Sequence, residues 1–138
     1  MHKFRKTINF YDCDPAGIIF FARIFEICHS AYEDMIKTFN LKTDYWNNPD
    51  FAVPIIHTEG EYLLPLKPGD TVTVEVSVSK LKESSFELTY VCKNEENRMT
   101  NEVKTVHIFV DKRQWKKSPI ESNVKNNLSK HLTADQNS

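Results

Sequence analysis

The fold of this chain is decided by residues 11–17, which read YDCDPAG, and by the apolar run that follows them up to Phe39. A proline and a glycine close together end the short strand that precedes the run. Large apolar residues then recur at alternating spacings of four and three, as on one face of an α-helix. These residues are Phe21, Phe25, Cys28, Tyr32, Met35 and Phe39. We therefore predict one long helix over residues 20–39 at the centre of the core.

The rest of the chain shows mostly the patterns of β-strands. Residues 71–81 alternate most cleanly, because valines at every second position share one face while polar residues share the other. Strands are predicted over residues 3–12, 53–64, 71–81, 86–93 and 103–110. Short connections between most of them favour antiparallel neighbours. The predicted fold class is α+β, with an antiparallel sheet of about five strands wrapped around the one long central helix.

The length of 138 residues suits one domain, which we place at residues 1–116. Residues 117–138 are predicted to form a polar C-terminal tail, with one short, weakly amphipathic helix before a disordered end. The apolar positions of that helix are Ile120, Val124, Leu128 and Leu132. One sheet and one helix leave much of the sheet uncovered, so we expect a homodimer or a homotetramer.

Composition and charge exclude several classes of protein. The formal net charge of -1 gives no general attraction to nucleic acid or to an anionic membrane surface. No apolar run is long enough to cross a bilayer, and no apolar signal segment follows the basic N-terminus, so we expect a cytoplasmic protein. Cys13, Cys28 and Cys92 have no paired spacing, which favours free thiols in a reducing compartment. Histidine, cysteine and aspartate fall at no metal-ligand spacing, so no metal site is expected.

Residues 12–21, DCDPAGIIFF, resemble the signature of the 4-hydroxybenzoyl-CoA thioesterase family of hotdog-fold proteins. A second match consists of Pro65, the Gly69-Asp70 pair, the valines of residues 72–78 and the Ser85-Phe86 pair. Residues 28–33, CHSAYE, and 50–57, DFAVPIIH, are similar to the branch of this family that cleaves 1,4-dihydroxy-2-naphthoyl-CoA. The resemblance covers roughly residues 3–115 and implies a hotdog fold that hydrolyses an acyl-CoA thioester, with an aromatic acyl group.

The resemblance also implies a site. It gives the catalytic role to Asp14, the acid directly before Pro15, and a substrate contact to Gly17. It further implies that the backbone N–H of Phe21, in the first turn of the helix, polarises the thioester carbonyl. A carboxylate there can attack the carbonyl or activate a water, and the residues do not choose between these two roles. An aspartate before a helix is also favoured as a simple cap, which is the alternative interpretation of Asp14.

The phosphates of coenzyme A require cations. Lys80 and Lys82 flank one turn, while Lys112 and Arg113 follow the last strand, so these four residues are candidate CoA contacts. His57 is a candidate for the lining of the substrate pocket, because its strand can reach that pocket. An ordinary solvated face is the alternative for each of the five. CoA is expected only as part of the substrate, with no separate cofactor.

Other functions stay open at this point. A non-catalytic acyl-CoA or acyl-carrier-protein binding module would use Asp14 only as a cap. A thioesterase of short aliphatic acyl-CoA would keep the chemistry but change the acyl group. A hydratase or dehydratase is disfavoured, since that class pairs a histidine with a carboxylate near the helix, and no histidine follows Asp14 until His29, inside the helix.

Overall fold

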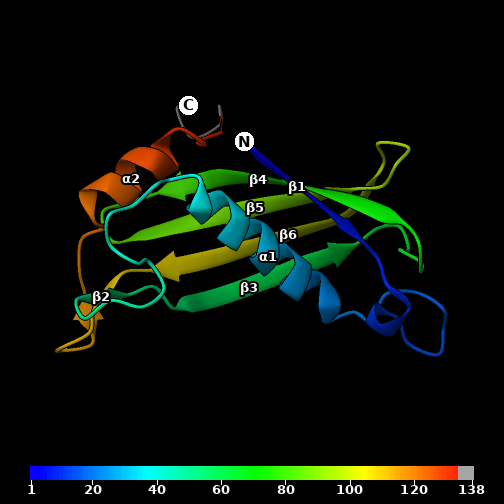
Figure 1. Ribbon diagram of the computed structural model, residues 1–138, viewed down its shortest axis with the longest axis horizontal. Helices are drawn as coiled ribbons and strands as arrows, with labels where there is room; N and C mark the ends of the chain where they lie inside the picture. The colour runs from blue at the N-terminus through cyan, green and yellow to red at the C-terminus, as the bar shows by residue number, and fades with distance from the viewer. Residues whose placement is uncertain (134–138) are drawn as a thin grey trace.

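Residues 1–133 are those that the computed structural model describes, and over this range the chain forms two α-helices and two antiparallel sheets (Figure 1). The larger sheet has five strands in the order β1-β4-β5-β6-β3. These are β1 His2–Thr7, β3 Ile55–Tyr62, β4 Thr71–Leu81, β5 Ser85–Lys93 and β6 Met99–Ile108. The smaller sheet, in the order β2-β7-β8, consists of β2 Phe51–Ala52, β7 Val110–Asp111 and β8 Lys116–Lys117. The predicted α+β class with a five-stranded antiparallel sheet is confirmed.

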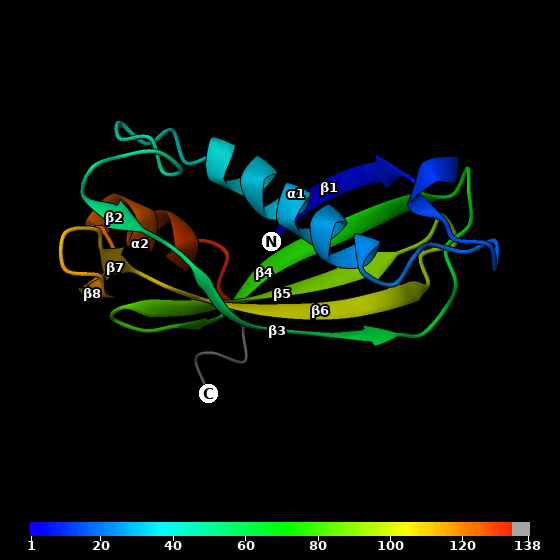
Figure 2. The ribbon, with the colours of Figure 1, turned by 90° about the horizontal axis from the view of Figure 1, so that it is seen from below.

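Both helices, α1 Arg23–Lys37 and α2 Ser122–Ser129, lie on the same face of the larger sheet (Figure 2). The core lies between this face and the helices. Strand β4 shows how the sequence builds it, because its alternate valines are fully buried while the residues between them are not. The buried positions are Val72, Val74, Val76 and Val78. The strand has the bounds that its alternation predicts.

Helix α1 begins three residues later than the predicted residue 20. The residues before it stay extended or turn, because the Ile19 N–H donates to the carbonyl of Leu66 and the Phe20 N–H donates to the carbonyl of Asp12, both at 2.8 Å. These bonds hold the chain away from the helix axis until Arg23. Phe21, which was predicted on the buried face, is therefore 63% exposed. The buried side of the helix consists of Ile24, Ile27, Cys28, Ala31, Tyr32, Met35 and Ile36.

The first and last predicted strands differ most from the observed bounds, while those predicted over residues 53–64 and 86–93 differ by one or two residues at an end. The first ends at Thr7, because Asn9 starts a short 3-10 helix, Phe10–Asp12, in which the Asp12 carboxylate accepts a hydrogen bond from the Asn9 N–H at 2.9 Å. The strand predicted from residue 103 begins at Met99 instead. The loop before it is short, since the Asn94 side chain closes a tight turn by accepting from the N–H groups of residues 96 and 98, each at 3.0 Å.

The weak helix predicted after residue 117 is α2, and it packs against β4. Its N-terminus is capped by Glu121, whose carboxylate accepts from the N–H groups of Asn123 and Val124 at 3.0 and 3.1 Å. Val124 and Leu128 are buried in the same core as α1. The predicted disorder of the last residues concerns positions outside the described range.

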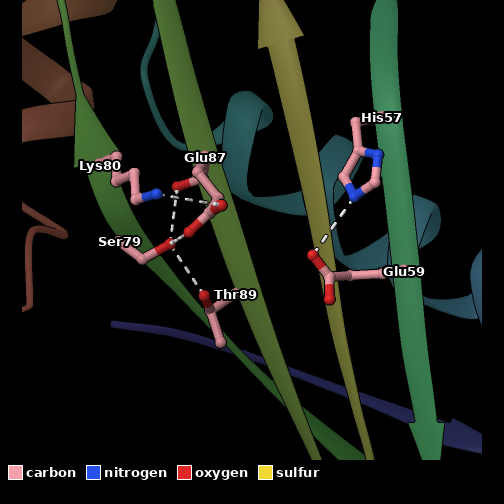
Figure 3. A network of polar contacts seen from close by, with 6 residues as sticks. All are labelled: His57, Glu59, Ser79, Lys80, Glu87 and Thr89. Atoms are coloured by element: carbon pink, nitrogen blue, oxygen red, sulfur yellow. Dashed lines mark hydrogen bonds and ion pairs between the residues drawn. The ribbon is translucent and has the colours of Figure 1, made fainter.

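The face of the larger sheet that carries no helix is polar. Figure 3 shows part of it, where the Ser79 hydroxyl donates to the Glu87 carboxylate at 2.8 Å and accepts from the Thr89 hydroxyl at 2.8 Å. On β3 of the same face, His57 pairs with Glu59 at 3.3 Å. Exposed pairs of this kind contribute little stability, but they pair the polar side chains of this face with one another. This face therefore offers little apolar surface for another layer.

The three cysteines are free thiols, as predicted. The Sγ atoms of Cys28 on α1 and Cys92 on β5 lie 3.9 Å apart in the core, and Cys13 is half-buried near the surface. The hydrogen bond with the Cys92 thiol, and next burial, raise the pKa of the Cys28 thiol, so this side chain stays protonated.

Candidate active site

Asp14 lies in a tight turn that joins two short extended pieces, residues 13 and 19, which form an isolated antiparallel bridge. The Asp14 N–H donates to the carbonyl of Ile18 at 3.1 Å, and the Gly17 N–H donates to the carbonyl of Asp14 at 2.9 Å. Gly17 has a φ of 81°, which a residue with a side chain adopts only with strain. One carboxylate oxygen of Asp14, Oδ1, accepts from the Ala16 N–H at 2.9 Å. The turn thus fixes the side chain of Asp14 through Oδ1 and leaves Oδ2 outside this contact.

A cavity of about 410 Å³ opens beside this turn. Its walls come from the turn, from the end of β3 with the segment after it, and from the start of β6. They are mostly apolar, and polar groups come only from Asp14, Tyr62 and Asn101 among the residues that line it. The full lining is Asp14, Ile18, Ile19, Phe21, Tyr62, Leu63, Leu64, Pro65 and Asn101. A half-buried carboxylate at the wall of an apolar cavity suits a nucleophile or a general base.

Phe21 also lines the cavity, but it lies in the turn before α1 and not in the first turn of the helix, which corrects the predicted placement. The N–H groups of Phe20 and Arg23 are engaged by the carbonyls of Asp12 and Phe20. None of the hydrogen bonds formed within residues 1–133 uses the Phe21 N–H. The Phe21 carbonyl accepts from the Tyr62 hydroxyl at 2.5 Å, which ties the turn to β3.

The other predicted contacts do not meet Asp14 within one chain. Strand register places Tyr62 opposite Asn101 on β6, whereas His57 lies opposite Val106, five positions further along β6 and therefore about 16 Å away. His57 lies on the polar outer face (Figure 3). Lys80 and Lys82 line a small hollow of about 110 Å³ that Val106 also lines, so they lie at the same distant end.

Lys112 and Arg113 follow β7, which lies at the opposite end of the molecule from the Asp14 turn in Figure 1. The Lys112 ammonium donates to the carbonyl of Asn48 at 2.5 Å. Arg113 lines a separate hollow of about 470 Å³ beside Asp50 and Phe51. In one chain the four candidate cations therefore lie at the end away from the carboxylate.

Sequence reasoning missed the two other polar residues of the cavity. Tyr62 is the last residue of β3, and no local motif distinguishes it. Asn101 lies within the polar run after Lys93 that was predicted to be a hairpin loop. Because this run is polar, its last residues were not predicted to belong to a strand. Only the register between β3 and β6, which pairs Tyr62 with Asn101, brings these two residues together.

The pairing that a hydratase would need is not formed. His29 lies on the exposed side of α1, where its Nδ1 pairs with Glu33 at 3.0 Å, and it does not line the cavity with Asp14. Within residues 1–133 no group of three histidine, cysteine, aspartate or glutamate side chains is arranged to hold a metal ion. No helix in the same range is long and apolar enough to cross a membrane.

Comparisons with known proteins show which folds and families this chain resembles. A solved 1,4-dihydroxy-2-naphthoyl-CoA thioesterase from Synechocystis superposes with a TM-score of 0.87 at 22% identity, covering 93% of this chain and 95% of that one. A solved gentisyl-coenzyme A thioesterase superposes with a TM-score of 0.81 at 21% identity, covering 91% of this chain and 98% of that one. At these identities the likeness shows the fold, which is the hotdog-like fold of thioesterases.

A curated relative from Crocosphaera subtropica, named 1,4-dihydroxy-2-naphthoyl-CoA hydrolase, is 33% identical over 112 residues, covering 78% of this chain and 81% of the relative. Fold and relatives together define a thioester hydrolase that acts on acyl-CoA. The chain belongs to the thioesterase-like superfamily, whose family model matches residues 8–128. The resemblance found in the sequence is thereby confirmed.

Proposed function

We propose that this protein hydrolyses an aromatic acyl-CoA, with 1,4-dihydroxy-2-naphthoyl-CoA as the leading substrate, and that Asp14 performs the chemistry. The observation that carries the proposal is the Asp14 carboxylate in the wall of an otherwise mostly apolar cavity. The volume of about 410 Å³ lies within the usual range for small-molecule sites. The names of the relatives support the same acyl group.

The thioester carbonyl would lie between Asp14 and the turn before α1. Oδ2 of Asp14 either attacks the carbonyl carbon, which gives a mixed anhydride and releases the CoA thiolate, or removes a proton from a water that attacks instead. The Phe21 N–H, which is free of other partners within residues 1–133, would stabilise the oxyanion. A thiolate leaves readily, so no separate general acid and no cofactor are required.

The sheet would curl around α1 as in a hotdog domain, and two copies would pair along β3. Strand β3 is an edge of the five-stranded sheet, and large apolar side chains are exposed along it and just after it. They are Ile55, Ile56, Tyr62 and Leu63. Because the outer face of the sheet is polar, pairing of two copies along the β3 edge is favoured over packing of their outer sheet faces against each other. We therefore propose a homodimer rather than a homotetramer.

This pairing would also unite the predicted contacts. In an antiparallel pair of β3 strands, the Ile55 end of one strand lies beside the Tyr62 end of the other. The partner's Lys80 and the partner's Lys82 would then lie at the end that carries Asp14, where the CoA phosphates need cations. A site shared between subunits accounts for cations that are remote from the carboxylate in one chain.

The role of Asp14 is tested by Asp14→Asn. Asparagine keeps an Oδ1 acceptor for the Ala16 N–H and removes only the charge and the second carboxylate oxygen, so the turn is expected to persist. We expect kcat for 1,4-dihydroxy-2-naphthoyl-CoA to fall by about 10²-fold or more. The matched control is Asp70→Asn, because Asp70 also accepts a backbone N–H in a turn, from Lys67 at 2.8 Å, but lies outside the cavity.

Turnover by Asp14→Asn within a few-fold of the wild-type rate would refute the assigned role. Tight binding of acyl-CoA by the wild-type protein without release of free thiol would instead identify a binding module. Faster hydrolysis of a short aliphatic acyl-CoA than of the naphthoyl substrate would keep the enzyme class and change the acyl group.

The dimer is tested by Ile56→Lys at the β3 edge, with Ile56→Val as the control. Ile56 is 60% exposed in the single chain, so a charge there is tolerated by the monomer but not by a paired edge. We expect light scattering to show a dimer for wild type and Ile56→Val, and a monomer with a KM for acyl-CoA raised about tenfold or more for Ile56→Lys. A monomeric wild-type protein with full activity would contradict the shared site.

A further inference from the structure

The start of β6 contains a β-bulge beside Asn101, a polar residue that lines the cavity. Asn101 pairs with Cys92 on β5, whereas Met99 pairs with Lys93, so Thr100 is an extra residue on β6. Consecutive residues of a regular strand point to opposite faces, yet Thr100 and Asn101 are both buried. Bulges next to functional sites commonly re-aim a side chain. Here the extra residue Thr100 is brought to the buried side, while Asn101 keeps the inward face that it shares with Val103, Thr105 and His107.

The bulge is held in place by several hydrogen bonds. The Thr100 hydroxyl donates to the carbonyl of Cys92 at 3.3 Å. The Thr100 carbonyl accepts from the N–H groups of Leu63 and Leu64 at 2.9 and 3.2 Å, and both of these residues line the cavity. The backbone that carries Asn101 is therefore fixed from both neighbouring strands, and the position of its side chain is set before any ligand enters.

The Asn101 side chain lacks the partner that its burial demands. Only 1% of Asn101 is exposed, and its Oδ1 atom makes no hydrogen bond within residues 1–133. Buried amide oxygens are almost always paired, since leaving one unpaired is unfavourable. Of the other polar groups of the cavity, the Tyr62 hydroxyl donates to the Phe21 carbonyl and Oδ1 of Asp14 accepts from the Ala16 N–H, while Oδ2 of Asp14 is the atom proposed for the chemistry. Asn101, which lines the cavity, thus carries a buried acceptor without a donor.

We propose that Asn101 is a specificity residue, whose Oδ1 accepts a hydrogen bond from a hydroxyl group on the aromatic ring of the acyl chain. The proposal rests on the proposed function and adds the group that selects among aromatic substrates. An apolar wall accepts any ring of suitable size, but it cannot favour a hydroxylated ring over its deoxy analogue. A buried acceptor does so strongly, because the deoxy analogue leaves it unpaired.

The test compares kcat/KM for 1,4-dihydroxy-2-naphthoyl-CoA with kcat/KM for 2-naphthoyl-CoA, which lacks both hydroxyl groups. Wild type should prefer the hydroxylated substrate by about 10²-fold or more. Asn101→Leu, similar in volume but apolar, should lower this ratio to about tenfold or less, chiefly by slowing the hydroxylated substrate. Asn101→Ser, which keeps an oxygen acceptor, should retain part of the preference, and it remains informative where Asn101→Leu fails to fold.

The matched control is Thr105→Val, which removes a buried polar group from the same strand but outside the cavity, where Thr105 bonds to Tyr90 and His107. It should leave the ratio unchanged. A wild-type ratio close to one, or an Asn101→Leu ratio equal to that of wild type, would overturn the proposal.

A binding measurement separates this inference from the proposed function. Calorimetry under argon would compare the affinities of wild type and Asn101→Leu for 1,4-dihydroxy-2-naphthoate and for 2-naphthoate. A preference of about tenfold or more for the dihydroxy acid that is lost in Asn101→Leu supports the role of Asn101, even if no thioester is hydrolysed. Equal affinities of wild type for the two acids overturn the role of Asn101, even if both thioesters are hydrolysed.

Discussion

The two ends of β6 each bury a polar side chain with an unpaired atom, and they differ in what lies beside it. At the cavity end, which comprises the Asp14 turn, Tyr62 and Asn101, the free Oδ1 belongs to a residue that lines the cavity. At the closed end, His107 has a free Nδ1 but lines neither this cavity nor the small hollow beside Phe86. An unpaired polar atom therefore suggests a ligand only where its residue lines a cavity large enough to hold one.

The closed end is packed around His107. Its ring stacks on Phe86 with a centroid distance of 4.6 Å and an interplanar angle of 3°, and Tyr32 meets it edge-on at the same distance. Its Nε2 atom bonds to the Thr105 hydroxyl at 2.7 Å. Aromatic contacts of this kind add stability beyond the buried area. We therefore expect changes at the closed end to lower stability, and changes at the cavity end to lower activity.

The largest effect on stability is expected for Leu128→Ala on α2, compared with Leu63→Ala at the cavity end. Leu128 is fully buried, so its truncation should lower the free energy of unfolding by about 2–5 kcal/mol and leave kcat/KM unchanged. Leu63 is 51% exposed, so its truncation should cost less than about 1 kcal/mol and raise KM. Urea unfolding and steady-state kinetics measure both. Equal losses of stability in the two variants would contradict the comparison.

A second test uses the pH dependence of stability. Burial, and to a smaller extent the charge of His29, lower the pKa of His107 from 6.5 to about 3. Between these values the unfolded chain binds more protons than the folded chain, so His107 contributes stability above pH 6.5 that is lost as the pH falls toward 3. The slope from this one group is at most about 1.4 kcal/mol per pH unit.

His107→Phe should therefore flatten the fall of the unfolding free energy between pH 6.5 and 4, measured by urea titration at each pH. The matched control is His57→Gln, because His57 lies exposed on the outer face and should leave the slope as it is. A slope that His107→Phe does not change would show that the imidazole is not held neutral.

A smaller loss of stability than that of Leu128→Ala is expected for two glycines in similar turns. Gly17 and Gly69 have φ values of 81° and 91°, and a Cβ on either would meet nothing within 4 Å. Alanine should therefore cost only the backbone strain, about 1–2 kcal/mol at each site. Gly17→Ala should in addition lower kcat/KM by about tenfold or more, since it displaces Asp14. Loss of activity in Gly69→Ala as well would show that the effect is not local to the site.

The same contrast explains what could be predicted from the sequence. Strand β4 could be predicted to the residue, because every second side chain reports its burial. The start of α1 could not, since Phe20 and Phe21 fit the helical spacing while the bond from the Phe20 N–H to Asp12 keeps them out of the helix. The spacing of apolar residues shows which segments could form one face of a helix, but it does not show which hydrogen bonds the backbone of those segments forms.

The candidate site divides in the same way. Asp14 is carried by a motif, so the resemblance found it. Asn101 comes to the site through the register of β6 with β3, where it pairs with Tyr62, which is distant in the sequence. The placement of Lys80 beside Asp14 would depend on a second chain. Contacts that are set by strand register or by assembly leave no local pattern to detect.

The number of thiols that react with a reagent distinguishes the folded state of this protein from the unfolded state. Cys28 and Cys92 are closed off from solvent, while Cys13, the neighbour of Asp14, is partly accessible. A chromogenic disulfide reagent should therefore react with one thiol in the native protein and with three thiols after denaturation. Since the sulfur that reacts in the native protein adjoins the Asp14 turn, shielding of that sulfur by an acyl-CoA would give an optical signal of occupancy that requires no added label.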